Sequence, residues 1–281
     1  MFYFWFLAIQ YSAFTLDVMK KARPWLIIAH PGHELRVFHW LELNRPHVVI
    51  LTDGSGDTGL SRLDSSRRLI EAAGATLEEN LGNVEDDDVY RWILEKQTEH
   101  LLDFADFLVD AWAIQPPSMV AGDSIEGCET THDLCRYVIN AACEIHFRRT
   151  GSKFPNLDFP LLGQPNTSKS LAPDDVRLVL DEAAFERKLA AARGYHELQA
   201  EVEYALSTFG PAAFTLETLR SVDLHDGLAG LNPEPPSYEV AGEKRVKEGR
   251  YQNVIRYRQH VLPVVNEMRE RLGLSQDLLQ K

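Results

Sequence analysis

The stretch Trp25-Leu-Ile-Ile-Ala-His-Pro-Gly-His-Glu34 decides the fold class of this chain. Its first five residues are apolar and partly β-branched, which is typical of a strand buried on both faces of a parallel sheet. The polar residues that follow, from His30 onward, must then lie at the carboxyl end of that strand. Ligands bind at this edge in open α/β sheets. The stretch therefore predicts both an architecture and the position of a functional site.

Strand-like and helical segments alternate along the chain. Residues 47–52 are apolar and β-branched and predict a second strand, and the Asp53-Gly54-Ser55-Gly56 segment after it predicts a loop. Apolar spacing predicts helices over 63–75 and 133–147, and the apolar residues 107–109 predict the start of a third strand. Such alternation indicates a mostly parallel, Rossmann-like α/β sheet flanked by helices on both faces. Further helices are expected over residues 174–205 and 248–272.

The composition is that of one packed domain rather than of a disordered chain. Of the 281 residues, 44% are hydrophobic and 25% are charged. We expect one α/β domain over residues 25–281, preceded by an extension over residues 1–24. Residues 1–16 are apolar, but this run is too short to span a bilayer, and basic residues follow it, whereas a secretory signal carries them in front. We expect residues 1–16 to be an upstream extension or a strand or helix that packs on the domain. A peripheral membrane contact and a secretory signal are the alternatives, and no stable membrane insertion is predicted.

An acidic charge balance narrows the choice of partners. The chain has 29 Lys and Arg residues against 42 Asp and Glu residues, for a formal net charge of -13, so it repels phosphate backbones and nucleic acid is not expected as a partner. A local pocket can still accept a small anionic substrate. The cysteines Cys128, Cys135 and Cys143 are odd in number and form no CxxC pair, which predicts reduced thiols and a cytoplasmic protein. The sequence is also compatible with a homo-oligomer.

Three histidines are candidate ligands of a metal ion. His30 and His33 are three residues apart at the turn after the first strand, and His132 ends a polar segment, 123–132, that we expect to be a loop at the same edge of the sheet. Imidazole nitrogen is a good ligand for zinc, and a catalytic zinc usually has three protein ligands and an open position for water. Paired histidines that cap helices are common, so it is the placement of all three that favours a metal site. We predict Zn²⁺, with another divalent metal as the alternative.

The same segment resembles a known family. Ala29-His-Pro-Gly-His-Glu34 is similar to the Ala-His-Pro-Asp-Asp-Glu signature of the PIG-L/LmbE-like zinc de-N-acetylases. In the same order, Thr52-Asp53-Gly54 resembles the family's Thr-x-Gly loop, the sequence that starts at Arg68 resembles its Arg-x-x-Glu helix, and residues 126–132 resemble its segment ending in His-Pro-Asp-His. The resemblance covers roughly residues 25–147. It implies a zinc-dependent hydrolase that removes an N-acetyl or other N-acyl group from an amino sugar or glycoconjugate.

The departures from the family pattern fall on the residues that transfer protons. The family's general base is the first Asp of the signature, and Gly32 stands in its place. The second Asp is a zinc ligand, and His33 replaces it conservatively. Glu129 stands where the family has a histidine that helps to stabilise the oxyanion, and Cys128 stands where it often has a tyrosine. The resemblance therefore implies an intact set of three histidine ligands beside a rewritten set of proton-transfer residues.

Hydrolysis by metal-activated water still requires a proton acceptor near the metal. Glu129 is the first candidate because it lies on the segment that carries a predicted ligand, and Asp53 is the second; a solvated loop carboxylate is the alternative for Glu129. Arg68, Asp123 and Glu126 are expected to contact a small N-acylated sugar substrate, and an exposed helix arginine is the alternative for Arg68. The leading prediction is thus a zinc-dependent de-N-acetylase. The alternatives are a non-catalytic relative that binds a sugar-like ligand, and a metal-dependent reaction other than deacetylation.

Overall fold

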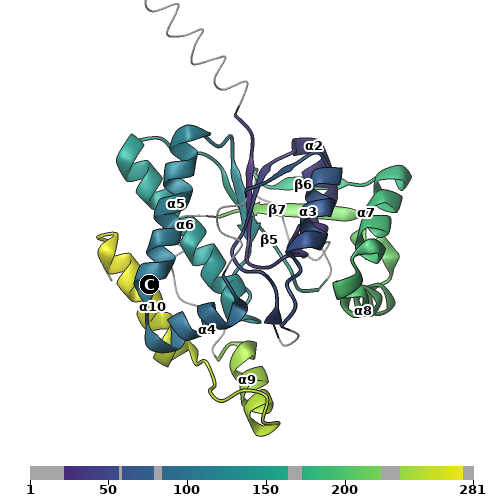
Figure 1. The fold of residues 1–281 in the computed structure, drawn as a ribbon. Helices are drawn as coiled ribbons and strands as arrows, with labels where there is room; N and C mark the ends of the chain where they lie inside the picture. The colour runs from purple at the N-terminus through teal and green to yellow at the C-terminus, as the bar shows by residue number, and fades with distance from the viewer. Residues whose placement is uncertain (1–21, 57–58, 79–83, 164–172, 223–234, 275–281) are drawn as a thin grey trace, which may run out of the picture.

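The computed structural model describes residues 22–56, 59–78, 84–163, 173–222 and 235–274 (Figure 1). The extension predicted over residues 1–24 lies outside this part of the chain as far as residue 21. Among the described residues, no helix is both long and apolar enough to cross a membrane.

The two apolar runs of the sequence form adjacent parallel strands. β1, Trp25–Ile28, pairs with β2, His47–Ile50, with Trp25 opposite His47. Every residue of both strands is buried. This burial is the reason that both strands read as continuous apolar runs rather than as an alternation of apolar and polar residues.

These strands belong to a seven-stranded sheet of order β3-β2-β1-β4-β5-β7-β6. The first five strands along the chain pair in parallel, and β7 runs antiparallel to both of its neighbours, β5 and β6. The prediction of a mostly parallel α/β sheet is therefore confirmed. The remaining strands are β3 (Thr76–Leu77), β4 (Val120–Asp123), β5 (Asn156–Phe159), β6 (Val176–Val179) and β7 (Leu216–Ser221).

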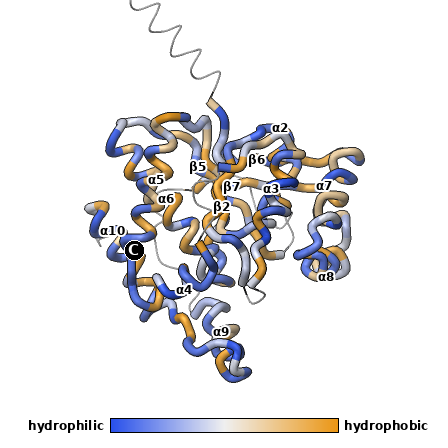
Figure 2. The backbone as a smooth tube through the Cα atoms, viewed as in Figure 1, coloured by the Kyte–Doolittle hydropathy of each residue, from blue (hydrophilic) through white to orange (hydrophobic). Residues whose placement is uncertain are grey.

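Helices cover both faces of the sheet (Figure 1). The side chains of β1 alternate between these two faces. Trp25 and Ile27 pack with α4, α5, α6 and α10, whereas Leu26 and Ile28 pack with α2, α3 and α7. Figure 2 shows the hydrophobic segments along the central strands between these layers. The helices of the first face are α4 (Asp86–Glu95), α5 (Thr98–Ile114), α6 (Thr130–Thr150) and α10 (Leu262–Arg271); those of the second are α2 (Phe38–Asn44), α3 (Leu63–Ala72) and α7 (Glu182–Gly194).

The strand order creates a switch point beside β1. The chain adds β2 and β3 on one side of β1 and then returns to place β4 on the other side. β1 leads to α2 on one face of the sheet, and β4 leads to α6 on the opposite face, so the two connections diverge. Such a divergence opens the crevice in which α/β sheets bind ligands. His30 lies two residues after β1 and Asp123 ends β4, so both lie at this crevice.

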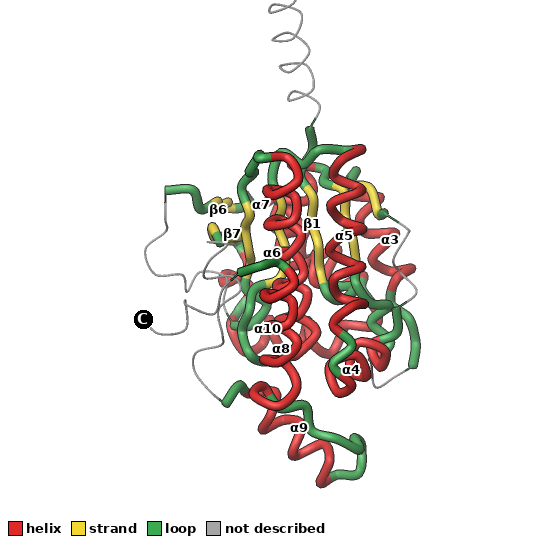
Figure 3. The backbone as a smooth tube through the Cα atoms, turned by 90° about the vertical axis from the view of Figure 1, so that its left-hand side faces the viewer, coloured by secondary structure: helices red, strands yellow, loops and turns green. Residues whose placement is uncertain are grey.

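Two helices lie outside the two layers. Within α8, Gln199–Phe209, no side chain is buried, and this helix contacts α7. α9, Ser237–Lys247, lies at the lower end of the molecule in Figures 1 and 3. Short helical turns complete the described elements: the 3-10 helices η1 (His33–Val37), η5 (His196–Leu198) and η6 (Pro211–Phe214), and the π-helical turn η8 (Tyr257–Val261).

The prediction of a strand at residues 107–109 is wrong, because these residues lie within α5. The buried residues of α5 include Leu101, Ala105, Leu108 and Trp112, which recur at helical spacing. An apolar run of three residues has no period of its own, so it cannot separate a strand from the buried face of a helix. The strand beside β1 is β4.

The predicted helices over 63–75 and 133–147 are confirmed as α3 and α6, whereas the two later predictions are partly wrong. Residues 174–205 include the strand β6 before α7 and α8. The sequence pattern did not indicate this strand, because it is short and has little periodicity of its own beside an Ala-rich helical segment. In the predicted helix 248–272, the helical part begins only at η8, and α10 follows with Pro263 in its first turn.

Candidate metal centre

The turn after β1 is held by its own side chains. Gly32 has a φ of 105°, in the left-handed region that glycine tolerates, and it reverses the chain between His30 and η1. Glu34 is fully buried and accepts a hydrogen bond from the backbone N–H of Gly32 at 2.7 Å, and the Ser66 hydroxyl also donates to it. The turn brings the ring centroids of His30 and His33 to 5.3 Å from each other.

The contacts of His30 determine which ring nitrogen faces the site. Its Nδ1 lies 2.7 Å from Oγ1 of Thr52 and 3.1 Å from Oδ1 of Asp86. An ionised carboxylate can only accept a hydrogen bond, so Nδ1 carries a proton. Nε2 lies 3.4 Å from Oε2 of Glu129, which favours a proton on this nitrogen as well, so a metal ion bound at Nε2 would take the place of that proton.

His33 is oriented in the same way. Its Nδ1 lies 2.9 Å from Oδ2 of Asp123, which also accepts the backbone N–H of Ala29 at 2.8 Å. Asp123 was predicted to contact substrate; it is 0% exposed, and these contacts are within the chain. Histidines that bind metals commonly direct the second ring nitrogen to a carboxylate or a carbonyl group, which fixes the ring and leaves the first nitrogen as the ligand. His33 therefore presents Nε2 as a potential ligand.

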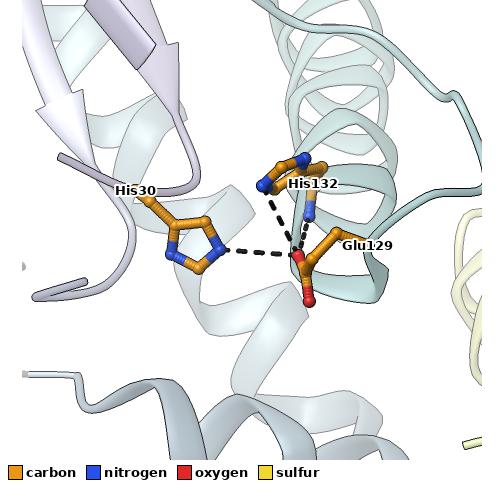
Figure 4. Close-up of side chains that lie close together, drawn as sticks. All are labelled: His30, Glu129 and His132. Carbon is orange, nitrogen blue, oxygen red and sulfur yellow. Dashed lines mark hydrogen bonds and ion pairs between the residues drawn. The ribbon is translucent and has the colours of Figure 1, made fainter. Parts of the chain in front are cut away.

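Glu129 and His132 lie at the start of α6. The prediction that the whole segment 123–132 is a loop is therefore wrong, because its last residues belong to this helix. Glu129 is the N-cap of α6, and its Oε2 accepts the backbone N–H of His132 at 3.0 Å. The same oxygen lies 3.4 Å from Nε2 of His30 and 3.6 Å from Nε2 of His132 (Figure 4). The phenol of Tyr90, in α4, donates to Oε1 of Glu129 at 2.7 Å. The carboxylate of Glu129 is thus held between two imidazole rings.

Three imidazoles and the Glu129 carboxylate form one cluster. The ring centroid of His132 lies 5.1 Å from that of His30 and 4.5 Å from that of His33. One ligand atom each from His30, Glu129 and His132 lie within 4.8 Å of one another, so this group could hold a metal ion, with His33 beside it. Imidazole nitrogen and carboxylate oxygen are donors that zinc accepts, and two of the rings already have the supporting partners that zinc sites use. The residues present therefore fit a zinc ion.

Buried charge makes this position attractive to a cation. Burial lowers the pKa of His30, but its hydrogen bonds to Asp86 and Glu129 outweigh burial and raise the pKa to about 9. Burial, followed by electrostatic interactions with His33 and His30, lowers the pKa of His132 to about 3. The carboxylates of Asp86 and Glu129 thus favour a positive charge at His30, while His132 stays neutral with a lone pair available.

The other predicted site residues are engaged elsewhere in the chain. Asp53 accepts hydrogen bonds from the backbone N–H of Ser55 at 2.9 Å and from its hydroxyl at 2.7 Å. Arg68 is exposed and donates a hydrogen bond to the hydroxyl of Ser65, which lies in the same helix, α3. Glu126 accepts the backbone N–H of Leu161 at 2.8 Å. The structure therefore brings the three histidines and Glu129 together. The side chains of Asp53, Arg68 and Glu126 instead bond to neighbouring parts of the chain.

Sequence reasoning did not identify two residues that support the cluster. Asp86 and Tyr90 are one turn apart on α4, and they contact His30 and Glu129 respectively. The available signal was the acidic run Asp86-Asp87-Asp88, but acidic residues are ordinary in the first turn of a helix. Only the packing of α4 across the crevice distinguishes Asp86 from its neighbours.

Comparisons with known proteins give only distant structural similarity. The sequence matches no protein-family model and, at a significant level, no curated protein. Among solved structures, the pseudoaglycone deacetylase of the antimicrobial reagent A40926 is 19% identical, with a TM-score of 0.48 over 71% of this chain and 96% of that one. A deacetylase of teicoplanin biosynthesis is 12% identical, with a TM-score of 0.49 over 72% and 99% of the two chains, and a zinc-inhibited form of teicoplanin deacetylase is 11% identical, with a TM-score of 0.48 over 71% and 99%. Similarity this low does not bear on the reaction of this chain.

Proposed function

We propose that this protein is a zinc-dependent amide hydrolase in which His30, His33 and His132 hold the metal. The observation that carries the proposal is the support of the first two rings: Nδ1 of His30 lies 3.1 Å from Oδ1 of Asp86, and Nδ1 of His33 lies 2.9 Å from Oδ2 of Asp123. Ligand histidines commonly have such a partner behind them. By resemblance to the de-N-acetylases, the enzyme would remove an N-acyl group from an amino sugar or glycoconjugate.

The chain's own residues can supply the proton transfer. Bound zinc would polarise the amide carbonyl and make water acidic enough to attack near neutral pH. Glu129 is placed to take the proton, because its Oε2 lies within 3.6 Å of ring nitrogens of His30 and His132. Tyr90 and the N–H of His132 hold the carboxylate in place. The protonated Glu129 can then return the proton to the leaving amine.

Four further residues complete the proposal. Asp53 is the second candidate for the proton acceptor, and Arg68 and Glu126 are candidates for substrate contact. Each of these would exchange a hydrogen bond within the chain for one to the substrate. We assign Asp123 to the support of His33, because it is completely buried and its Oδ2 already accepts from the ring.

The proposal is tested by amide hydrolysis under control of the metal. Purified protein is stripped with a chelator, reconstituted with one equivalent of zinc and assayed for amine release from N-acetylglucosamine, its glycosides and longer N-acyl analogues. We expect activity that appears with zinc, disappears on chelation and returns on reconstitution. Zinc-loaded, folded protein that hydrolyses none of these amides would overturn the proposal.

A non-catalytic sugar-binding relative is the second candidate function. One observation favours it: a Cβ at Gly32, where the resemblance implies the general base, would lie only 2.2 Å from Cδ1 of Leu198. A carboxylate at the position of the family's base would therefore have to displace the end of the Leu198 side chain. Calorimetric binding of an amino sugar to zinc-loaded protein that shows no turnover would establish this second function.

A further inference from the structure

Two cavities of different chemistry adjoin the histidine cluster. One, of about 360 Å³, is lined by Glu129 and by polar residues beyond α9, among them Gln252 and Asn253. The other, of about 310 Å³, reaches His33 and His132 and is lined by α7 and α8. Figure 1 shows α7 and α8 at the right of the molecule and α9 at its lower end. The cluster therefore adjoins two compartments, one lined by both polar and apolar residues and a more apolar one beside α8.

α8 indicates what the second cavity receives. Val202, Ala205 and Leu206 line this cavity, as does Leu198 just before the helix, and their spacing places them on one helical face. In a surface helix, such an apolar face normally covers the core. Within α8, Gln199–Phe209, none of the side chains is buried. The apolar face of α8 therefore covers a cavity rather than the core. An apolar ligand in this cavity would remove the apolar face of α8 from water.

The wall nearest to the histidines is apolar as well. Leu198 fills the space in front of the turn that carries His30 and His33, since its Cδ1 lies 2.2 Å from where a Cβ of Gly32 would be. Leu161 and Phe214 add to the apolar lining, and Arg36, Arg62, Lys188 and Glu201 supply its charged part. The cavity thus joins His33 and His132 to mostly apolar surface, as a chain attached to a reacting carbonyl group requires.

We infer that the cavity beside α8 receives the acyl chain of the substrate, and that this acyl group is longer than acetyl. The inference rests on the proposed amide hydrolysis and names its substrate class: an amino sugar or related polar amine that carries a medium-length N-acyl chain. With the carbonyl at the histidine cluster, the acyl chain lies along α8 and the polar amine extends toward the cavity lined by Gln252 and Asn253. The methyl group of an acetyl substrate would leave most of the apolar face of α8 in water.

The test compares N-acetyl-, N-butanoyl- and N-octanoylglucosamine as substrates of the zinc-loaded protein. We expect kcat/KM to rise about tenfold or more from acetyl to octanoyl, since burying a few methylene groups exceeds the roughly 1.4 kcal/mol that a tenfold change represents. Ala205→Phe, which fills the cavity, should lower kcat/KM for the octanoyl substrate about tenfold more than for the acetyl substrate. The matched control Ala200→Phe, at an exposed position of the same helix, should change neither value.

A binding measurement separates this inference from the proposed function. N-octylglucosamine contains no amide, and we expect it to bind wild type and Ala200→Phe about tenfold or more tighter than glucosamine, and to lose this advantage in Ala205→Phe. If it binds in this way while no amide is cleaved, the cavity is assigned correctly and the hydrolase proposal is wrong. If acetyl and octanoyl substrates are cleaved equally well and the octyl group adds nothing to binding, the inference is overturned and the hydrolase proposal stands.

Discussion

The side chain of Leu198 occupies the space into which any side chain at position 32 would project. A Cβ at Gly32 would lie 2.2 Å from Cδ1 of Leu198 and 3.7 Å from Cζ of Tyr195. By resemblance, position 32 is that of the general base in the de-N-acetylases. Gly32 and Leu198 are therefore complementary: Gly32 has no side chain, and the side chain of Leu198 fills the space that a side chain at position 32 would occupy.

Gly32→Asp is therefore expected to lower stability without raising turnover. The new side chain would have to displace Leu198 at a φ of 105°, which side chains rarely adopt. Gly32→Ala isolates the contact when it is compared with Gly151→Ala, because Gly151 also has a positive φ, of 71°, and a Cβ there would meet no described atom within 4 Å. We expect Gly32→Ala to cost about 1–3 kcal/mol more free energy of unfolding than the control, as overpacking usually does, measured by denaturant titration.

A gain of turnover in Gly32→Asp would contradict this prediction. It would mean that Leu198 moves aside and that a carboxylate at position 32 can reach the reacting atoms. The double variant Gly32→Asp/Leu198→Ala then tells whether the leucine or the backbone conformation limits the restored base.

The metal prediction is tested by stoichiometry. His30→Ala and His132→Ala each remove one imidazole from a cluster whose ring centroids lie 4.5 to 5.3 Å apart. We expect one zinc per chain in the wild type and much less in either variant, measured by elemental analysis after desalting. His196→Ala, at an exposed position, is the matched control and should keep the full content. Stoichiometric zinc in both cluster variants would exclude this assignment.

The position of the site could be predicted from the sequence because its first half is local. The apolar run of β1 and the polar turn after it are adjacent in sequence, so the edge of the sheet and His30 could be inferred together. The role of Asp123 could not, because it depends on β4 lying next to β1, and the apolar residues that predicted a third strand belong to α5. The antiparallel insertion of β7 depends on long-range pairing in the same way.

Asp123→Asn is expected to weaken zinc binding while the fold persists. Asparagine keeps the size of the side chain and an oxygen for the N–H of Ala29, but it removes the charge that faces Nδ1 of His33. Loss of such a supporting partner typically lowers metal affinity about 10- to 100-fold. Competition with a chromogenic zinc chelator measures the change. Asp158→Asn, on the neighbouring strand β5 and paired with Arg220, is the control and should leave the affinity as it is; an equal loss in both variants would point to general destabilisation.

Residues 25–281 are predicted to form one domain, so residues 1–150 should not be stable alone. The sheet takes β5, β7 and β6 from beyond residue 150, and β4 would lose its pairing with β5 in the fragment. The fragment would also lose α10, whose Val264, Val265 and Met268 are buried in the core beside α5 and α6. Limited proteolysis followed by mass spectrometry should find no persistent fragment of this length. A soluble, cooperatively unfolding fragment of residues 1–150 would contradict the prediction.

Glu129→Gln separates proton transfer from metal binding and from helix capping. The Gln side chain can still accept the N–H of His132 at the N-cap of α6, so stability should change little, but its amide cannot take a proton. Removal of a positioned base typically costs about 10² to 10⁴ in rate, so kcat should fall by that amount while zinc content stays at one per chain. Glu144→Gln, on the same helix α6 and paired with Arg148, is the matched control. If Glu129→Gln loses its zinc, Glu129 is a ligand rather than the base. If it keeps its zinc and more than half of the wild-type kcat, the base is another group, and Asp53 is the next to test.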